Sequence, residues 1–288
     1  MNDKPETFSE WIGRRETVTD TITPVPAMAL AATLDRPPFP IAAGDALPLP
    51  WHWIYGLPLA RQSEIGPDGH PKRGGFLPPI PQPRRMWAGS RITSHRLLRV
   101  GERVERISTI DAIKTREGRT GKLVFVTVHH AWKPRDDDVA LEEWQDIVYR
   151  DPPRPGEDPP PPTAADTNVE WSRMIKPDPV LLMRYSALTF NAHRIHYDLV
   201  YATSVEGYPA LVVHGPLTAT LLLDALQRAR PGATIRTFAF KGMRPLFHDQ
   251  PFTINGRDEG NGRFALWAAN MQGELAMQAS AETGQAPG

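Results

Sequence analysis

The sequence predicts an α+β protein in which a helix and an antiparallel sheet occur twice in tandem. A proline-rich stretch, 151–166, divides the 288 residues into halves of similar length. Each half contains short amphipathic strands separated by turns. The runs SRITSHRLLRVGERV and RTFAFKGMRPLFHDQPFTI, one in each half, share the same succession of amphipathic strand, polar turn and second strand. These three observations favour two similar domains in one chain.

The first half is expected to begin with a short helix over residues 27–34 and to continue into a long loop. That loop, 66–83, is rich in glycine and proline, and loops of this length inside a domain are usually functional or mobile. Strands are predicted after it at residues 90–98, 103–116, 122–132 and 141–149. The domain would span residues 1–150.

Residues 151–170 are expected to form an extended, semi-rigid linker. The four consecutive prolines at 159–162 can join neither a helix nor a central strand. The second domain, 171–288, begins with an extended segment and an irregular stretch, followed by a buried helix over 214–230 that Pro231-Gly232 ends. Strands are predicted at 234–243, 251–258, 263–270 and 275–282.

Composition excludes several functional classes. The net charge is zero, which argues against a nucleic-acid or anionic-membrane partner. The chain has no cysteine, which excludes disulfides, thiolate metal sites and cysteine nucleophiles and is compatible with the cytoplasm. The first twenty residues lack the apolar core of a signal peptide. The longest apolar run, 211–226, is interrupted by His214, Pro216 and Asp224 and is too short to span a bilayer.

One segment, 184–215, combines residues suited to moving protons beside a carbonyl group. Asn191, His193 and His196 lie close together in it, and His214-Gly215 follows at the start of the predicted helix. Imidazole titrates near neutral pH and can both take and give a proton. Free N–H groups at a helix start stabilise a developing negative charge. This combination predicts the addition or removal of water next to a thioester carbonyl.

Four stretches resemble a known family: RYSALTFNAHRIHYD at 184–198, VVHG at 212–215, HWIYG at 52–56 and GGFLPPIPQPRRMWAGSRI at 74–92. They are similar to the MaoC-like dehydratases and hydratases, and within these to the type 2 hydroxyacyl-thioester dehydratases. The resemblance implies a double hotdog, in which each domain wraps an antiparallel sheet around a central helix. It also implies reversible hydration of a 2-enoyl-CoA, with the CoA thioester as substrate and no metal or redox cofactor.

The resemblance also assigns roles. The second domain would be catalytic, whereas the first, which lacks the motif, would shape the substrate tunnel. The common family motif is an aspartate, then asparagine-proline, then a histidine five residues after the aspartate. His196 matches that histidine, but Asn191, His193 and Arg194 replace the other three. A carboxamide cannot act as a base at neutral pH, so the departure leaves the two-base mechanism open.

We expect His196 to transfer the proton and Asn191 to orient the water, although an asparagine here is also typical of a cap or turn. His193 would transfer a second proton or fix the tautomer of His196. On a regular helix Asn191 and His196 would lie roughly 140° apart, so a turn must separate them if both are to face one water. Gly215 would donate its N–H to the enolate oxygen, or merely allow close packing.

Four arginines are candidates for substrate binding. Arg84 and Arg85 would hold CoA phosphates or an acyl carboxylate, or belong to a solvated basic loop. Arg194 and Arg244 would hold a substrate carboxylate or form salt bridges within the protein.

The predicted function is a hydratase for a short, branched dicarboxylic enoyl-CoA. A hotdog thioesterase is the first alternative, but it needs a carboxylate near the helix, and residues 191–196 offer none. A non-catalytic acyl-CoA-binding protein is the second, and Asn191 in place of the acid keeps it open. A monomer and a homodimer are both compatible with the fold, because hotdog sheets pair edge to edge.

Overall fold

The computed structural model describes residues 8–37, 40–118, 121–152 and 160–284. Its strands are β1 Arg15–Thr21, β2 Arg84–Ser94, β3 Arg103–Gly118, β4 Gly121–Pro134, β5 Leu141–Arg150, β6 Trp171–Ile175, β7 Ile235–Gly242, β8 Phe252–Gly260, β9 Arg263–Asn270 and β10 Leu275–Thr283. Its α-helices are α1 Pro24–Thr33, α2 Pro179–Thr189 and α3 Gly215–Ala229. None of the helices in the described residues is long and apolar enough to cross a membrane.

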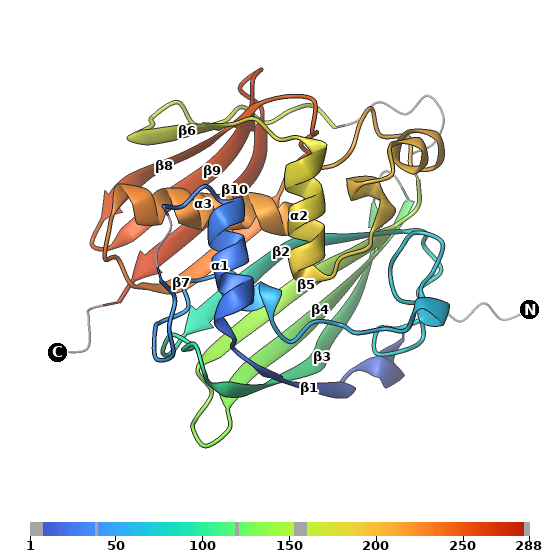
Figure 1. The fold of residues 1–288 in the computed structure, drawn as a ribbon. Coiled ribbons are helices and arrows are strands. Elements are labelled where there is room, and N and C mark those ends of the chain that lie inside the picture. The colour runs from blue at the N-terminus through green and yellow to red at the C-terminus, as the bar shows by residue number, and fades with distance from the viewer. Residues whose placement is uncertain (1–7, 38–39, 119–120, 153–159, 285–288) are drawn as a thin grey trace, which may run out of the picture.

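All ten strands belong to one antiparallel sheet, ordered β1-β3-β4-β5-β2-β7-β10-β9-β8-β6 (Figure 1). The first five and the last five follow the same path, because β1, β2, β3, β4 and β5 correspond in turn to β6, β7, β8, β9 and β10. The two halves join where β2 pairs with β7, from Gly89 opposite Lys241 to Thr93 opposite Thr237. The tandem arrangement predicted from the strand pattern is therefore confirmed.

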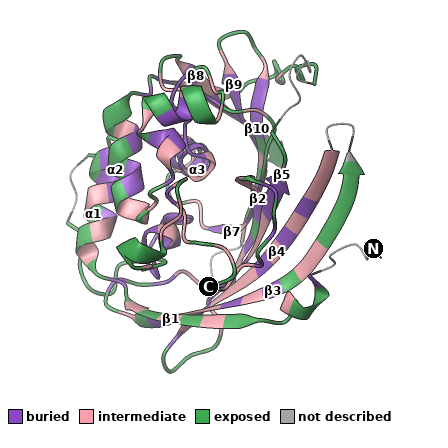
Figure 2. Ribbon diagram, turned by 90° about the vertical axis from the view of Figure 1, so that its right-hand side faces the viewer, coloured by how far each residue is buried: buried purple, intermediate pink, exposed green. Residues whose placement is uncertain are grey.

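Helix α3 lies inside the curved sheet, which wraps around it (Figure 2). Every residue from Leu217 to Leu226 is buried, so the helix is covered on all sides. Its bounds agree to within one residue at each end with the predicted helix, and it belongs to a core that includes residues of both halves.

Among the described residues, the first half has no counterpart of α3, so the central helix expected in each domain is present in the second domain alone. Residues of the chain between α1 and β2 pack against its strands instead, and this segment contains a short 3-10 turn at Trp51–Ile54. Ile80 of that segment packs against Val124, Val126 and Val128, alternate residues that share one face of β4. Repeated prolines and glycines keep this segment from forming a helix.

Several elements differ from the prediction. Strand β1 was not predicted, β6 lies in the extended segment predicted at the start of the second domain, and the start of the stretch predicted to be irregular belongs to α2. Asp178 caps α2 by accepting a hydrogen bond from the Leu181 N–H at 2.7 Å. Residues 153–159 of the predicted linker lie outside the described part of the chain. The next residues, from 160 on, lie against the second half. Ala164 forms an isolated β-bridge with Glu274, and Asp166 forms an ion pair with Arg257.

Candidate active site

The predicted catalytic segment lies between α2 and α3 and is irregular for a local reason. Helix α2 ends at Phe190, whose φ of 49° is left-handed. The Asn191 side-chain oxygen then accepts a hydrogen bond from the His193 N–H at 3.0 Å, which makes a tight turn. A short 3-10 turn, Arg194–His196, follows. The turn that the sequence required between positions 191 and 196 is thus present.

His196 is held with one ring nitrogen free. Its Nδ1 lies 2.7 Å from the carbonyl oxygen of Val212, and a carbonyl can only accept, so Nδ1 carries the proton and donates it. The Nε2 lone pair is left to accept a proton. Burial lowers the pKa of His196 to about 4, although the hydrogen bond to Val212 opposes this shift and the nearby His70 adds to it. His196 is therefore neutral at pH 7 and able to act as a base.

The imidazole of His196 stacks on that of His214, which is fully buried at the N-cap of α3. The Nε2 of His214 is hydrogen-bonded to the Ser186 hydroxyl at 2.8 Å. Gly215 is the first residue of α3, and N–H groups in the first turn of a helix have no acceptor within that helix. The stack thus places His196 beside the positive end of α3.

Asp68 and His70, from the first half, extend this cluster through His193. On one side His193 packs edge-on against His196, with ring centroids 5.5 Å apart. On the other it packs against His70, with centroids 4.1 Å apart. The Nδ1 of His70 lies 3.0 Å from a carboxylate oxygen of Asp68. The sequence pattern does not indicate Asp68 or His70, because they lie in a glycine-rich loop more than 120 residues before the motif.

The loop that carries these two residues touches the catalytic segment directly. Gly69 has a φ of +90°, and a Cβ on it would lie 1.8 Å from the carbonyl oxygen of Ala192. The Arg194 N–H donates to the carbonyl of Asp68 at 2.9 Å, and the Arg194 guanidinium donates to the carbonyl of Pro67 at 3.0 Å. Backbone contacts of this closeness fix the loop on the histidine cluster.

Asp68, His70 and His193 could also hold a metal ion, because one potential ligand atom from each lies within 4.8 Å of the others. Burial lowers the pKa of His193 to about 2 and that of His70 to about 4, and the charge of Arg85 further lowers that of His70. Burial raises the pKa of Asp68, but hydrogen bonds from His70 outweigh it and the net pKa is below the usual range. The three groups are thus two neutral imidazoles and one carboxylate.

Three of the four candidate binding arginines form ion pairs within the protein. Arg194 pairs with Asp198 at 2.7 Å, Arg244 with Glu274 at 3.3 Å and Arg84 with Glu206 at 3.1 Å. Arg85 differs, since no carboxylate of the described residues lies within 4 Å of it, while its charge acts on Asp68, His70 and His193. Among the four, Arg85 is the cation placed beside the imidazoles without an ion-pair partner in the described chain.

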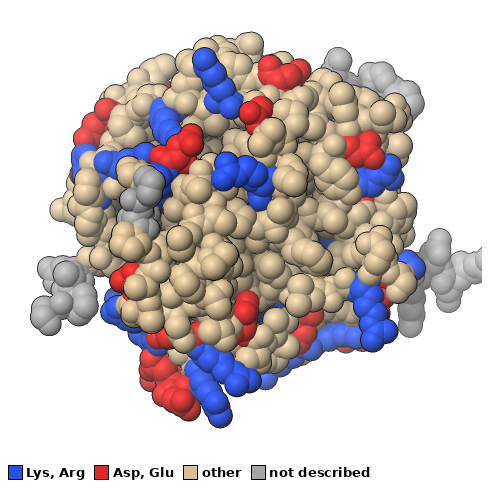
Figure 3. All heavy atoms as spheres, in the orientation of Figure 1, with Lys and Arg blue, Asp and Glu red and all other residues tan. Residues whose placement is uncertain are grey.

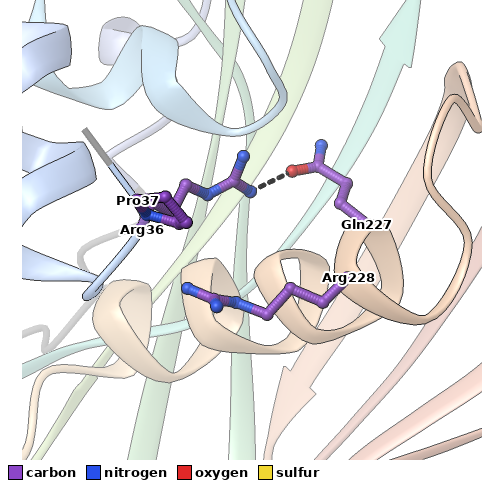
Figure 4. Close-up of a pocket in the computed structure, with 4 residues that line it drawn as sticks. All are labelled: Arg36, Pro37, Gln227 and Arg228. Carbon is purple, nitrogen blue, oxygen red and sulfur yellow. Dashed lines mark hydrogen bonds between the residues drawn. The ribbon is translucent and has the colours of Figure 1, made fainter. Parts of the chain in front are cut away.

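A separate cavity of about 260 Å³ lies at the other end of α3, lined by Arg36, Pro37, Gln227 and Arg228 (Figure 4). Its arginines are held by the protein itself. Arg36 and Arg228 each donate to the buried carboxylate of Asp224 at 2.7 Å, and Arg173 donates to it at 2.8 Å. Because these guanidinium groups already have partners, we interpret this cavity as part of a contact between the two halves.

The face shown in Figure 3 carries basic and acidic side chains interspersed. This agrees with the zero net charge of the sequence.

Comparison with known proteins identifies the family. Residues 50–248 match the model of the hydroxyacyl-thioester dehydratases type 2. The chain is 47% identical over 274 residues to the mesaconyl-C(4)-CoA hydratase of Chloroflexus aurantiacus, covering 95% of this chain and 97% of that one. Its fold is similar to that of HtdX from Mycobacterium tuberculosis, with a TM-score of 0.67 at 21% identity over 93% of this chain and 100% of that one.

A second Mycobacterium tuberculosis structure, described as a double hotdog, has a TM-score of 0.54 at 15% identity and covers 95% of this chain and 96% of that one. Together with the wrapped central helix, this confirms the predicted double hotdog. The family match and the 47% identical relative define a MaoC-like hydro-lyase that acts on acyl thioesters. The chain belongs to the hydroxyacyl-thioester dehydratase type 2 family.

Proposed function

We propose that this protein hydrates a short, branched, dicarboxylic 2-enoyl-CoA, of which mesaconyl-C4-CoA is the candidate, and that His196 is its proton-transfer group. The observation that carries the proposal is the state of His196, a neutral imidazole with Nε2 free, next to the first turn of α3. The name of the 47% identical relative supports the choice of substrate.

The proposed reaction balances with one imidazole. Nε2 of His196 takes a proton from water as the water oxygen bonds to Cβ of the substrate. The electrons of the double bond move toward the thioester oxygen, where the N–H of Gly215 stabilises the negative charge. The imidazolium then returns its proton to Cα, which gives the 3-hydroxyacyl-CoA. Both proton steps use His196, so this scheme needs no metal or redox cofactor.

Asn191 keeps a narrower role in this scheme. Its side-chain oxygen already accepts the His193 N–H, so one lone pair of that oxygen and the NH₂ group remain to orient water or a neighbour. His193 lies between His70 and His196 and would support the ring of His196. We also propose that the first domain forms the substrate tunnel and that the second domain is catalytic.

Arg85 would bind the free carboxylate of the acyl group. A guanidinium without an ion-pair partner in the described chain, near His70 and His193, matches a planar carboxylate with two parallel hydrogen bonds. Ion pairs occupy Arg84, Arg194 and Arg244, which leaves them less free for this purpose. A terminal carboxylate on the acyl group would therefore lie on the first-half side of the histidine cluster.

The reaction is tested by following the absorbance of the conjugated enoyl thioester, which falls on hydration, while a thiol reagent reports free CoA. We expect the absorbance to fall without release of thiol. Release of thiol would instead identify a thioesterase. Tight binding of the ester with neither signal would identify a non-catalytic binding protein.

The carboxylate preference is tested with Arg85→Gln and enoyl-CoA esters with and without a distal carboxylate. The loss of a charged hydrogen bond should weaken kcat/KM for the dicarboxylic ester by about 10- to 100-fold and leave the other ester unchanged. Arg91→Gln is the matched control, because Arg91 lies on the same strand and forms an exposed pair with Asp146. An equal loss on both esters would contradict the assignment.

We infer that the enzyme acts in the cytoplasm, as a monomer or as a homodimer. Strands β1 and β6 form the two ends of the sheet, and each offers an edge to a second copy. Light scattering of the purified chain at several concentrations distinguishes the two states.

A further inference from the structure

We propose that Asp68 and His70, from the first half, complete the active site as a carboxylate–imidazole dyad that holds the reacting water together with His196. This inference rests on the proposed hydration of an enoyl-CoA. The family motif would supply a carboxylate from the second half, but this chain has Asn191 at that position. Asp68 is the carboxylate that acts electrostatically on His70 and His193.

The dyad fixes the tautomer of His70. The ionised carboxylate of Asp68 only accepts hydrogen bonds, so the Nδ1 of His70, 3.0 Å away, must be the donor. The other oxygen of Asp68 accepts the backbone N–H of His70, also at 3.0 Å, and this holds the carboxylate in place. The Nε2 of His70 is therefore left as an acceptor, as the Nε2 of His196 is.

Two acceptor nitrogens suit a water that must attack through its oxygen. If each Nε2 accepts one hydrogen of the same water, the lone pairs of the oxygen are free to point at Cβ. The rings of His70 and His196 both pack against that of His193, with centroids 4.1 and 5.5 Å from it, and the His70 side chain is 20% exposed, so water can reach it. His196 takes the proton and returns it to Cα, while His70 accepts the second hydrogen bond. Asp68 acts through His70 and is a positioning residue.

The local charge favours this role over a metal site. Burial and the charges of Arg85 and Arg73 lower the pKa of His70, whereas the carboxylate of Asp68 raises it. The two guanidinium charges disfavour a divalent cation and favour the enolate that forms during hydration. The rings of His70 and His193 also pack against each other, with centroids 4.1 Å apart and planes tilted by 38°.

The test uses the full chain with mesaconyl-C4-CoA, the same ester for every variant. His70→Leu removes the acceptor but fills the space, and kcat should fall about 100-fold with little change in KM. His70→Gln offers an amide oxygen as acceptor and should keep about tenfold more activity than His70→Leu. Asp68→Asn retains the loop hydrogen bond but loses the charge, and should lower kcat with KM unchanged.

The outcomes separate this inference from the proposed function. If the parent hydrates the ester and His196→Ala abolishes hydration, but His70→Leu is folded and as active as the parent, the dyad is wrong and the proposed function stands. If no hydration occurs in the parent, the proposed function itself fails. Loss of parent activity on dialysis against a chelator, restored by Zn²⁺, would show that the three residues bind a metal and would overturn the dyad. Equal activity of His70→Gln and His70→Leu would also overturn it.

Discussion

The ring of His196 lies face to face with that of His214, with centroids 3.6 Å apart and planes at 19°. A positive charge on either ring would be repelled by a charge on the other, and the two are buried together. Both rings are therefore neutral in the folded protein. Burial of the ring keeps the proposed base unprotonated well below the ordinary pKa of histidine.

The first prediction concerns the pH dependence of catalysis. A base works in its deprotonated form, which for His196 persists down to a pKa of about 4. We expect kcat/KM to stay level from pH 8 to about 5 and to fall as the pH approaches 4. Circular dichroism at each pH checks that the protein is folded. A fall centred near pH 6.5 would show that the base has an ordinary environment.

The second prediction concerns stability. His70, His130, His193, His196 and His214 all have a lowered pKa in the fold. Between the lowered values and about 6.5 the unfolded chain binds more protons, so the free energy of unfolding must fall as the pH falls through this window. Each such histidine contributes a slope of up to about 1.4 kcal/mol per pH unit.

Urea denaturation at pH 7.5, 6.5 and 5.5 measures that slope. His196→Gln is expected to flatten it, because one group that gains a proton on unfolding is gone. A free energy of unfolding that is constant from pH 7.5 to 5.5 would contradict the buried neutral state of these rings.

The third prediction concerns the contact between the two halves at the histidine cluster. Gly69→Ala would bring its Cβ to 1.8 Å from the Ala192 carbonyl oxygen, so the loop must move away. A shift of about 1 Å in a catalytic group can lower the rate about 100-fold. Gly74→Ala is the control, since Gly74 has a similar φ of +86° in the same loop, but its nearest neighbour is 3.9 Å away.

Both variants should lose about 1–2 kcal/mol of stability from left-handed strain. Only Gly69→Ala should also lose hydration activity. Equal activities of the two variants would show that the close approach of the loop does not matter for catalysis.

The fourth prediction concerns the carboxylate at the far end of α3. The Asp224 side chain is fully buried and pairs with Arg36, Arg173 and Arg228. Asp224→Asn leaves three guanidinium groups without their counter-charge and should lower the free energy of unfolding by about 3 kcal/mol, the lower end for buried pairs because the arginines are partly exposed. Asp166→Asn removes one partner of an exposed pair with Arg257 and should cost less than about 1 kcal/mol. Chemical denaturation measures the free energy of unfolding of both variants, and equal losses would contradict the prediction.

Much of the fold could be predicted because its signals are local. The apolar run after His214, stopped by Pro231-Gly232, gave the central helix to within a residue at each end. Alternating patterns and turns gave eight of the ten strands. Strand β1 was missed, and β6 was predicted as an extended segment without bounds. Both lie at the ends of the sheet, and their side chains alternate between exposed and half-buried, with Ile175 of β6 as the one buried residue, so neither strand has a clear apolar face. The start of α2 was missed because its Asp178 cap precedes a segment with little amphipathic pattern.

The sequence by itself determined the tandem sheet, the central helix and the segment that carries His196 and Gly215, since each follows from spacing between near neighbours. Only the tertiary structure decided that Asp68 and His70 lie beside His193. It alone also decided that Arg84 forms an ion pair with Glu206, whereas Arg85 forms none with the described residues. Contacts between residues more than 100 positions apart depend on how the two halves pack. The local pattern around Asp68 and His70, and that around His193 and His196, therefore do not predict that these residues meet.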